Sequence, residues 1–400
     1  MKTKLIPNSG YLNNKQIKQH LEIVKVLSKS DRSLTIAEIS DAVQISLPTT
    51  KNLVSQLIDQ DWAINLGKKE TDFGRKPELF GLNYDRFFTI GVLVTLKKIA
   101  LVISDINLNI IHEDQLEGYK LENHQNSLNI LVEFIRKNLA QKHLSINQIL
   151  GIGVGITGRV CRVKGISYNY FNFMDLPLKK YLERELGVQV EIDNDTRILG
   201  IAEKEKGTAK NLRNALVVNM DLGLGMSMLL NGEIVTGQNG FAGEFGHMKF
   251  GNKDRLCLCG NRNCLGTEVS GYALVLDLQD ALRNGEKSMA FKDPDGEYSY
   301  KEIIKVATQG DLLSIELIQK QGEKLGEALG NVINLLNPNK IIVAGEICKA
   351  DSIFLDPLKI GIKKSVLTDF VKNETVLFST NETNVAIGSA CLILRYHDLL

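Results

Sequence analysis

The chain of 400 residues contains little cysteine, proline or tryptophan, with six, seven and one of each. Its apolar runs all fall short of the roughly 20 residues that a membrane-spanning helix needs, and the stretch 1–15 lacks the apolar core of a signal peptide. Cys161, Cys348 and Cys391 lie far apart in the sequence, which is more typical of reduced thiols than of a disulfide framework. We therefore expect a cytoplasmic protein.

A strong charge of either sign is also absent, since the formal net charge is +1 at pH 7. Residues 1–86 carry 13 Lys and Arg against 10 Asp and Glu, and residues 87–400 carry 35 against 37. So small an asymmetry does not by itself indicate a nucleic-acid-binding protein, because charged faces are usually only solvated. With 44% hydrophobic and 24% charged residues, the composition is that of a globular protein of two or three domains.

The scarce cysteine is concentrated in one stretch, residues 239–271. His247, Cys257, Cys259 and Cys264 are separated there by nine, one and four residues. A tight loop with this spacing can bring three thiolates and one imidazole around a single ion, and this is the ligand set of a closed structural zinc site. We favour a zinc site over the alternative of three buried cysteines that share one turn by chance.

Two motifs in this stretch together resemble the signature of the ROK family of sugar kinases and sugar-responsive repressors. They are Ala-Gly-Glu-Phe-Gly-His-Met at 242–248 and Cys-Leu-Cys-Gly-Asn-Arg-Asn-Cys at 257–264. The resemblance implies that the histidine and the three cysteines hold structural zinc. It also implies that Glu244, with His247 beside it, contacts sugar hydroxyls. These motifs do not decide between a kinase and a repressor.

Helices are predicted in the first part of the chain. Apolar residues at helical spacing over 17–27 indicate the first, and Thr35 followed by Glu38 predicts a capping box at the start of the second. Ser46 is expected to cap a third helix with Pro48 in its first turn. Its predicted buried stripe consists of Leu53, Leu57 and Ile58. The residues expected to be exposed near its start are Thr49, Thr50, Lys51 and Asn52.

Three short helices with small polar and basic residues at the start of the third match a helix-turn-helix, in which those residues face base edges. Strand-like residues at 62–66 and 79–82 indicate a two-stranded wing. Between them, Gly-Arg-Lys-Pro at 74–77 resembles the Gly-Gly-Arg-Arg-Pro wing of ROK repressors. The predicted DNA contacts are Ser46, Thr49, Thr50, Lys51, Asn52, Arg75 and Lys76. The alternative is a three-helix bundle that binds protein.

Beyond residue 86, strand-like apolar runs alternate with helical patterns, which predicts an α/β fold. Strands are predicted at 90–94, 99–104, 109–111, 150–156, 188–192, 215–220, 226–230 and 341–343, and helices at 176–185 and 313–336. Two strand-rich halves of this kind resemble the duplicated actin-like ATPase fold of ROK proteins. We expect a winged helix-turn-helix domain at 1–86, a first α/β lobe at 87–200, and a second lobe with the zinc loop at 201–400.

The resemblance to ROK kinases fails at their phosphate-binding turns. The kinase turn after the first strand reads Asp-X-Gly-Gly-Thr-Lys, whereas this chain has Leu93 for the Asp, and Thr95 and Leu96 for the glycines. A leucine cannot orient a magnesium-bound water, and side chains keep the backbone from approaching a phosphate. The second turn has Asp221 and Leu222 where the kinases commonly have Gly-Thr. We therefore expect no phosphoryl transfer and no catalytic residue.

The sugar pocket of the family is better preserved. Asp193-Asn194-Asp195 resembles its Glu-Asn-Asp motif, which implies that Asn194 and Asp195 bind sugar hydroxyls. The alternative for Asp195 is capping of a helix at 196–206. Relatives usually carry a glutamate two positions after the last zinc cysteine, where this chain has Gly266. Glu268 is the expected replacement if the backbone shifts.

These features predict a ROK-type transcriptional regulator, a repressor of carbohydrate uptake or catabolism genes that binds a double-stranded DNA operator as a homodimer or homotetramer. A sugar or sugar derivative bound to the body would change the DNA affinity. Zinc would hold the loop that carries Glu244 and His247. Two alternatives stay open: a ROK-type carbohydrate kinase with an N-terminal extension, and a regulator controlled by a protein partner such as a sugar-transport protein.

Overall fold

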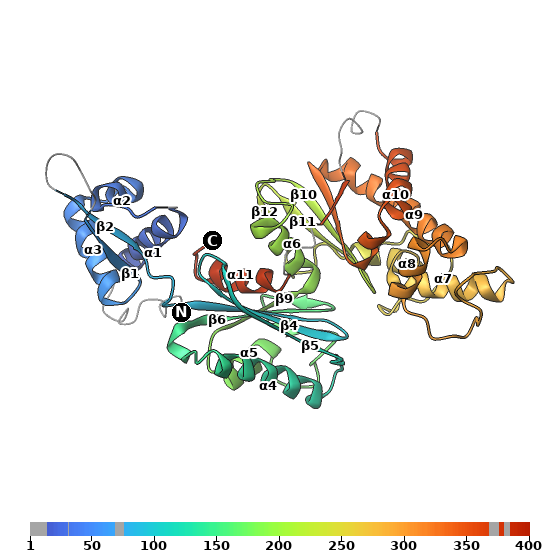
Figure 1. Ribbon diagram of the computed structural model, residues 1–400, viewed down its shortest axis with the longest axis horizontal. Helices are drawn as coiled ribbons and strands as arrows, with labels where there is room; N and C mark the ends of the chain where they lie inside the picture. The colour runs from blue at the N-terminus through green and yellow to red at the C-terminus, as the bar shows by residue number, and fades with distance from the viewer. Residues whose placement is uncertain (1–13, 31, 69–75, 368–375, 380–384) are drawn as a thin grey trace. The chain divides into compact units, whose positions relative to one another are not determined.

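The computed structural model describes residues 14–30, 32–68, 76–367, 376–379 and 385–400. They form two compact units (Figure 1). The first unit comprises the chain up to Asp195 together with the residues from Ala386 onward, and the second unit comprises Thr196–Val385. Among the helices of the described residues, none combines the length and apolar character that crossing a membrane requires.

The first unit begins with the predicted winged helix-turn-helix. Its elements are α1 (Asn14–Lys29), α2 (Ile36–Val43), α3 (Leu47–Asp59), β1 (Ala63–Lys68) and β2 (Glu78–Leu82), and the two strands pair antiparallel. The capping box of α2 is confirmed. The backbone N–H of Glu38 donates to the Thr35 hydroxyl at 3.3 Å, and the N–H of Thr35 donates to the Glu38 carboxylate at 2.8 Å. Two orphan donors at the helix start are thereby satisfied.

The rest of the first unit is built around a five-stranded sheet with the strand order β5-β4-β3-β6-β9. Its strands are β3 (Phe88–Val94), β4 (Lys98–Asp105), β5 (Ile110–Glu117), β6 (Ile149–Ile156) and β9 (Val190–Asn194), with a small β7–β8 hairpin (Val160–Cys161, Ile166–Ser167). The first three strands are antiparallel, whereas β3, β6 and β9 are parallel. Helices α4 (Gln125–Gln141) and α5 (Leu178–Leu186) cover one face, and α11 (Ala386–Tyr396) covers the other (Figure 1).

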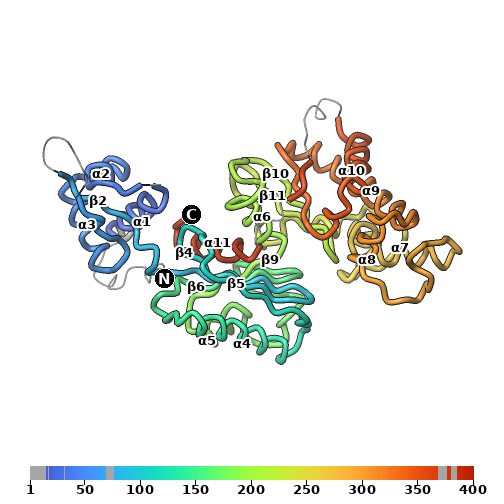
Figure 2. The backbone as a smooth tube through the Cα atoms, viewed as in Figure 1, coloured from blue at the N-terminus to red at the C-terminus, as the bar shows by residue number. Residues whose placement is uncertain are grey.

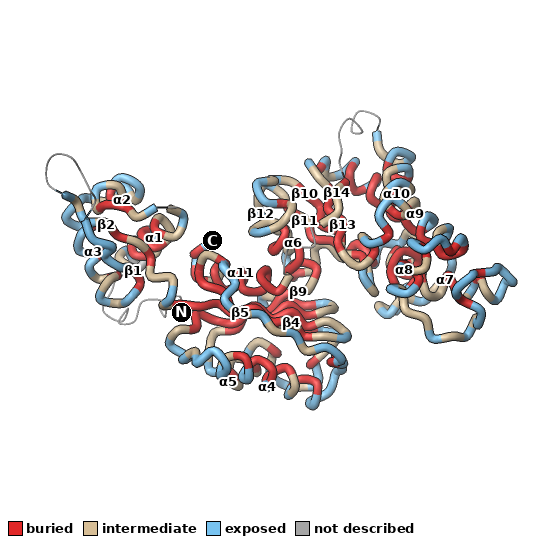
Figure 3. The backbone as a smooth tube through the Cα atoms, viewed as in Figure 1, coloured by how far each residue is buried: buried red, intermediate tan, exposed pale blue. Residues whose placement is uncertain are grey.

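Helix α11 approaches the sheet closely because two glycines lie beneath it. Gly91 of β3 and Gly153 of β6 are register partners. A Cβ atom at Gly91 would overlap the carbonyl oxygen of Ala386, and one at Gly153 would overlap that of Ser389. Only glycine permits this contact, and the resulting burial of α11 is visible in Figure 3. The first unit is thus completed by the end of the chain, a segment that the sequence analysis assigned to the second lobe.

The second unit repeats the topology of the first, with the strand order β12-β11-β10-β13-β14. Its strands are β10 (Ala215–Met220), β11 (Leu224–Leu230), β12 (Glu233–Ile234), β13 (Lys340–Ala344) and β14 (Val376–Phe378). Antiparallel and parallel pairings recur in the same places. The duplication expected from the sequence is confirmed.

Helices cover both faces of this second sheet. They are α6 (Asp195–Lys206) on one face, and α7 (Gly271–Arg283), α8 (Tyr300–Thr308), α9 (Leu312–Leu336) and α10 (Ser352–Ser365) on the other. Helices α9 and α10 lie side by side (Figure 2). Gly322 and Gly330 of α9 permit this, since a Cβ at Gly322 would lie 2.7 Å from the carbonyl oxygen of Phe354.

Candidate metal centre and ligand-binding residues

The predicted metal ligands come together in the second unit, within the segment 239–271. One ring nitrogen of His247 and the sulfur atoms of Cys257, Cys259 and Cys264 all lie within 4.8 Å of one another. His247 ends a short 3-10 turn, and the chain then returns to it through an isolated bridge between residues 249 and 264. The prediction that one loop gathers these four side chains is confirmed.

Two distances within the cluster match a tetrahedral ion site. The Cys257 Sγ lies 3.5 Å from the His247 Nδ1, and the Cys259 Sγ lies 3.7 Å from the Cys264 Sγ. With Zn–S bonds of about 2.3 Å and Zn–N bonds of about 2.0–2.1 Å, tetrahedral angles separate two sulfurs by about 3.8 Å and sulfur from nitrogen by about 3.5 Å. The donor set and its spacing therefore fit a zinc ion.

A glycine builds the turn that carries Cys257 and Cys259. Gly260 has φ +88°, in the left-handed region that favours glycine. Its N–H donates to the Cys257 carbonyl at 2.9 Å, and the Cys257 N–H donates to the Asn261 carbonyl at 2.8 Å. The two cysteines are thereby held at fixed positions in the turn.

The thiols of the cluster differ in how readily they ionise. Burial raises the pKa of Cys264 to about 12, and its sulfur neighbours add to the effect. Burial also opposes ionisation of Cys259, but hydrogen bonds from Asn261 and the neighbouring thiols outweigh it and lower the pKa. Cysteine binds a metal ion as the thiolate. A cation at the centre would therefore supply the positive charge that stabilises the thiolate of the buried Cys264.

Glu268, the expected replacement for the family's ligand-contacting glutamate, is buried beneath the zinc loop. Its side chain is only 1% exposed and forms an ion pair with Lys324 of α9. Its carboxylate also accepts hydrogen bonds from the backbone N–H groups of Asn252 and Lys253, the latter at 2.9 Å. Burial and the nearby charge of Lys253 lower the pKa of Lys324. Glu268 therefore supports the loop from inside.

Ion pairs fasten the same loop to helix α7. Lys253 Nζ lies 2.5 Å from the Asp277 carboxylate, and Arg255 lies 2.8 Å from Asp277 and 2.6 Å from Asp280. The Asp277 side chain is 8% exposed, so its charge is compensated by two cations rather than by water. The loop that carries the cluster is consequently anchored to both α7 and α9.

Glu244 and His247 lie beside each other and are both partly accessible to solvent. Their side chains are 32% and 39% exposed, and the Glu244 Oε2 lies 3.7 Å from the His247 Nε2. The other ring nitrogen, Nδ1, faces the sulfurs. A Cβ at Gly266 would lie 3.2 Å from the Gly246 carbonyl oxygen, so this glycine packs directly beside the segment that carries both residues.

A second polar group occupies the first unit, at the carboxyl ends of two parallel strands. Ile156 of β6 and Asn194 of β9 are register partners, so the residues that follow them meet at one sheet edge. The Thr157 hydroxyl donates to the Asp195 Oδ2 at 2.5 Å, and the Asn194 amide donates to the Asp195 Oδ1 at 2.8 Å and to the Gly158 carbonyl at 2.9 Å. Sequence reasoning missed Thr157, although it directly follows the predicted strand 150–156.

The turns at the kinase phosphate-binding positions are closed by their own hydrogen bonds. The backbone N–H and the hydroxyl of Thr95 both donate to the Lys98 carbonyl, at 3.0 and 3.1 Å. In the second unit, the Asp221 and Leu222 carbonyls accept from the first two residues of α7 at 2.8 and 3.0 Å. Leu93 is buried in the sheet of the first unit.

The start of α3 exposes most of the predicted DNA contacts. The exposed residues are Ser46, Thr49, Lys51 and Asn52, and Lys76 is exposed just before β2 of the wing. Thr50 was expected to be exposed but is fully buried, and its hydroxyl lies 3.4 Å from the Ile45 carbonyl. Ser46 precedes the helix as predicted but makes no side-chain cap; its hydroxyl instead lies 2.8 Å from that of Thr49. Arg75 lies outside the described residues.

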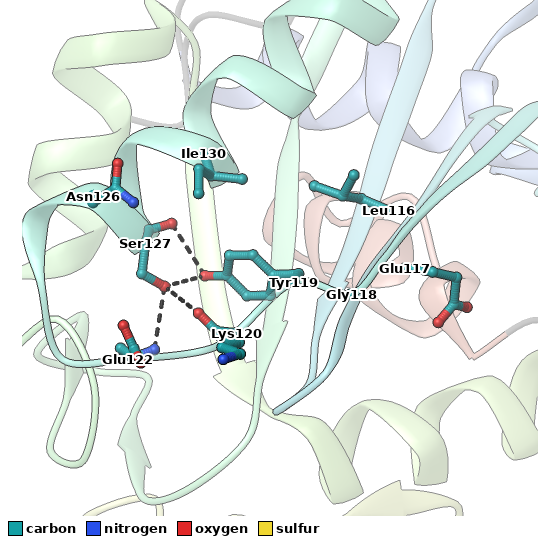
Figure 4. A pocket seen from close by; sticks show the side chains of 9 residues that line it. All are labelled: Leu116, Glu117, Gly118, Tyr119, Lys120, Glu122, Asn126, Ser127 and Ile130. Atoms are coloured by element: carbon teal, nitrogen blue, oxygen red, sulfur yellow. Dashed lines mark hydrogen bonds between the residues drawn. The ribbon is translucent and has the colours of Figure 1, made fainter.

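A surface hollow of about 430 Å³ lies between the end of β5 and the start of α4 (Figure 4). Tyr119 and Ser127 line it, and their hydroxyl oxygens are 2.7 Å apart. Ser127 also donates to the Lys120 carbonyl and accepts from the Glu122 N–H. Burial raises the pKa of Tyr119 to about 12. These polar groups bond to one another and serve the packing of α4.

Several known proteins are similar to this chain in sequence or in fold. The chain is 25% identical over 391 residues to the xylose repressor of Caldicellulosiruptor bescii, covering 96% of this chain and 97% of that one. It is 28% identical over 362 residues to the DNA-binding transcriptional dual regulator NagC of Escherichia coli, covering 90% and 88%. A solved ROK family transcriptional regulator, a homolog of the E. coli MLC protein, has a TM-score of 0.80 at 23% identity, with 96% of each chain covered. The model of the ROK family matches residues 89–396, and the chain belongs to that family.

Proposed function

We propose that this protein is a DNA-binding transcriptional regulator, a repressor of carbohydrate uptake or catabolism genes that responds to a sugar or sugar derivative. One observation carries the proposal: a winged helix-turn-helix with exposed Thr49, Lys51 and Asn52 on α3 is joined to the duplicated ROK body. The similarity to the xylose repressor extends over 96% of the chain and so includes this N-terminal segment. A DNA-binding regulator of this kind acts in the cytoplasm.

The proposed sugar contacts form two sets, one in each unit. Asn194 and Asp195, supported by Thr157, present an amide and a carboxylate in the first unit. Glu244 and His247 present a partly exposed carboxylate and imidazole in the second. A sugar ring carries donors and acceptors around its edge, so groups of this kind suit it. A ligand that binds one conformation of the body better than another shifts the equilibrium between the two conformations, and with it the DNA affinity.

In this proposal zinc has a structural role. His247, Cys257, Cys259 and Cys264 would hold the ion, which supplies folding free energy to the loop. With the Nδ1 of His247 on the metal, its Nε2 is left facing Glu244. The ion would thus fix the orientation of a ring that also contacts the ligand.

Phosphoryl transfer is not part of the proposed function. The closed β3–β4 turn and the buried Leu93 support this, because ATP phosphates require free backbone N–H groups and a metal-orienting carboxylate. A coupled assay of ADP release with hexoses, N-acetylhexosamines and pentoses tests it. Clear turnover with any of these sugars would establish the competing function, a carbohydrate kinase.

The decisive experiment measures binding of the full chain to DNA from upstream of its own gene, against a shuffled sequence of the same composition, over a series of salt concentrations. Two subunits would place two α3 helices in successive major grooves. We expect Asn52→Ala to reduce the preference for the upstream DNA by about 1–3 kcal/mol, and Lys51→Ala to weaken both complexes and reduce the salt dependence. Asn331→Ala, at an exposed asparagine of α9, is the matched control. Equal affinity for both DNAs would refute the proposal.

A further inference from the structure

The loop between β8 and α5 carries an unusual number of aromatic residues. Residues 168–173 read Tyr-Asn-Tyr-Phe-Asn-Phe. Phe171 is buried in the core of the first unit, whereas Tyr168 is 37% exposed and Phe173 is 42% exposed. Aromatic side chains bury large apolar areas when a partner covers them, so exposed rings that cluster in one loop mark a place for a ligand or a partner.

Hydrogen bonds hold the backbone of this loop in place. The Tyr168 N–H donates to the Arg159 carbonyl at 2.9 Å. The Asn172 N–H donates to the Asn123 side chain at 3.0 Å, and the Asn172 amide donates to the Tyr168 carbonyl at 2.7 Å. Phe171 has φ +58°, a conformation that is rare for a bulky residue and persists only where the surroundings impose it. The exposed rings are therefore attached to a preorganised backbone.

The same loop borders the Asn194–Asp195 pair within the first unit. The Arg159 N–H donates to the Asn169 side chain at 2.9 Å, and the carbonyl of the preceding Gly158 accepts from the Asn194 amide at 2.9 Å. Tyr170 is close enough to Asp195 that, after the larger effect of burial, the carboxylate charge contributes to raising the Tyr170 pKa. Asn169 and Tyr170 thus connect the exposed aromatic residues to the proposed sugar contacts.

We propose that Tyr168, Tyr170 and Phe173 form an aromatic subsite beside Asn194 and Asp195, and that the ligand is a disaccharide or longer oligosaccharide whose second ring packs on it. This inference rests on the proposed function. A sugar ring presents an apolar face of C–H groups and a polar edge, so an aromatic ring covers the face while nearby amides and guanidinium groups bond the edge. Asn169 and Arg159 supply such groups here.

Calorimetry on the full chain tests this, with glucose, xylose and N-acetylglucosamine compared with their β-1,4-linked disaccharides. We expect one disaccharide to bind about tenfold more tightly than its monosaccharide, the amount that an aromatic contact of this kind provides. Tyr168→Ala and Phe173→Ala should each remove most of that difference and leave the monosaccharide affinity unchanged. Val163→Ala is the control, since Val163 is an apolar residue of the same unit that is 85% exposed. Phe173→Tyr should keep the preference.

The outcomes separate this inference from the proposed function. Binding of a monosaccharide with the same affinity as its disaccharide, unaffected by Tyr168→Ala, would overturn the aromatic subsite and leave a monosaccharide-responsive regulator standing. A panel in which no sugar binds or changes DNA affinity would overturn both. A change in subunit association of the Tyr168→Ala variant, with disaccharide binding intact, would assign the loop to a protein interface and overturn the subsite.

Discussion

Replacing Glu268 by alanine tests whether this residue supports the zinc loop or contacts a ligand. The change leaves the Lys324 ammonium and the N–H groups of Asn252 and Lys253 without their buried acceptor. Removing one partner of a buried ion pair costs about 3–5 kcal/mol, and each buried N–H left without an acceptor costs about 1–3 kcal/mol. Because these losses share one carboxylate and are not additive, we expect a destabilisation of about 3–5 kcal/mol.

The zinc-loaded protein is unfolded with urea, and unfolding is monitored by the zinc that is released to a chromogenic chelator. Glu268→Ala should lower the midpoint of zinc release, and adding Lys324→Met should recover part of the loss because it removes the unpaired ammonium. Glu297→Ala, at an exposed glutamate of the same unit, is the control. A shift below about 1 kcal/mol, together with loss of the sugar response in DNA binding, would refute the structural role and return Glu268 to the ligand contacts.

Further predictions concern the helix-turn-helix, the metal centre and the close packing of α11. The backbone N–H of Thr35 and other donors lower the pKa of Glu38 to about 2, so its contribution to stability is present above its unfolded pKa of about 4.3 and is lost as the pH falls toward 2. Glu38→Gln should therefore be less stable than the native chain at pH 7 and approach it at low pH, as reported by the fluorescence of Trp62, the single tryptophan. Cys259→Ser should remove bound zinc and destabilise the second unit, and unchanged zinc by elemental analysis would contradict the assignment. Gly153→Ala should destabilise the first unit by about 1–3 kcal/mol or more, because the new Cβ overlaps the backbone of α11; an unchanged melting temperature would be inconsistent with that packing.

Local patterns predicted the elements that depend on neighbouring residues. The capping box at Thr35 and Glu38 formed as expected, because its donors and acceptors lie within one helical turn. The strands predicted at 150–156 and 215–220 match β6 and β10 because continuous apolar runs suit strands that are covered on both faces. The helical pattern at the start of α3 was misread at Thr50, since a threonine hydroxyl can be buried when it finds a carbonyl nearby.

The sequence by itself identified the His247, Cys257, Cys259 and Cys264 cluster by its spacing and the alternation of strands and helices by its periodicity. Its motifs carried the resemblance to the ROK family, and that resemblance implied the duplicated fold. Only the tertiary structure decided which unit α11 completes, since the contact between Gly153 and Ser389 joins distant parts of the chain. It also decided where the Glu268 side chain lies. Glu268 follows Gly266 by two positions, and from there its side chain lies beneath the loop. It pairs with Lys324, which belongs to the distant helix α9. The structure also brings Thr157 to the proposed site at Asn194 and Asp195. Parallel strands bring their carboxyl ends to one edge of the sheet only once they are paired.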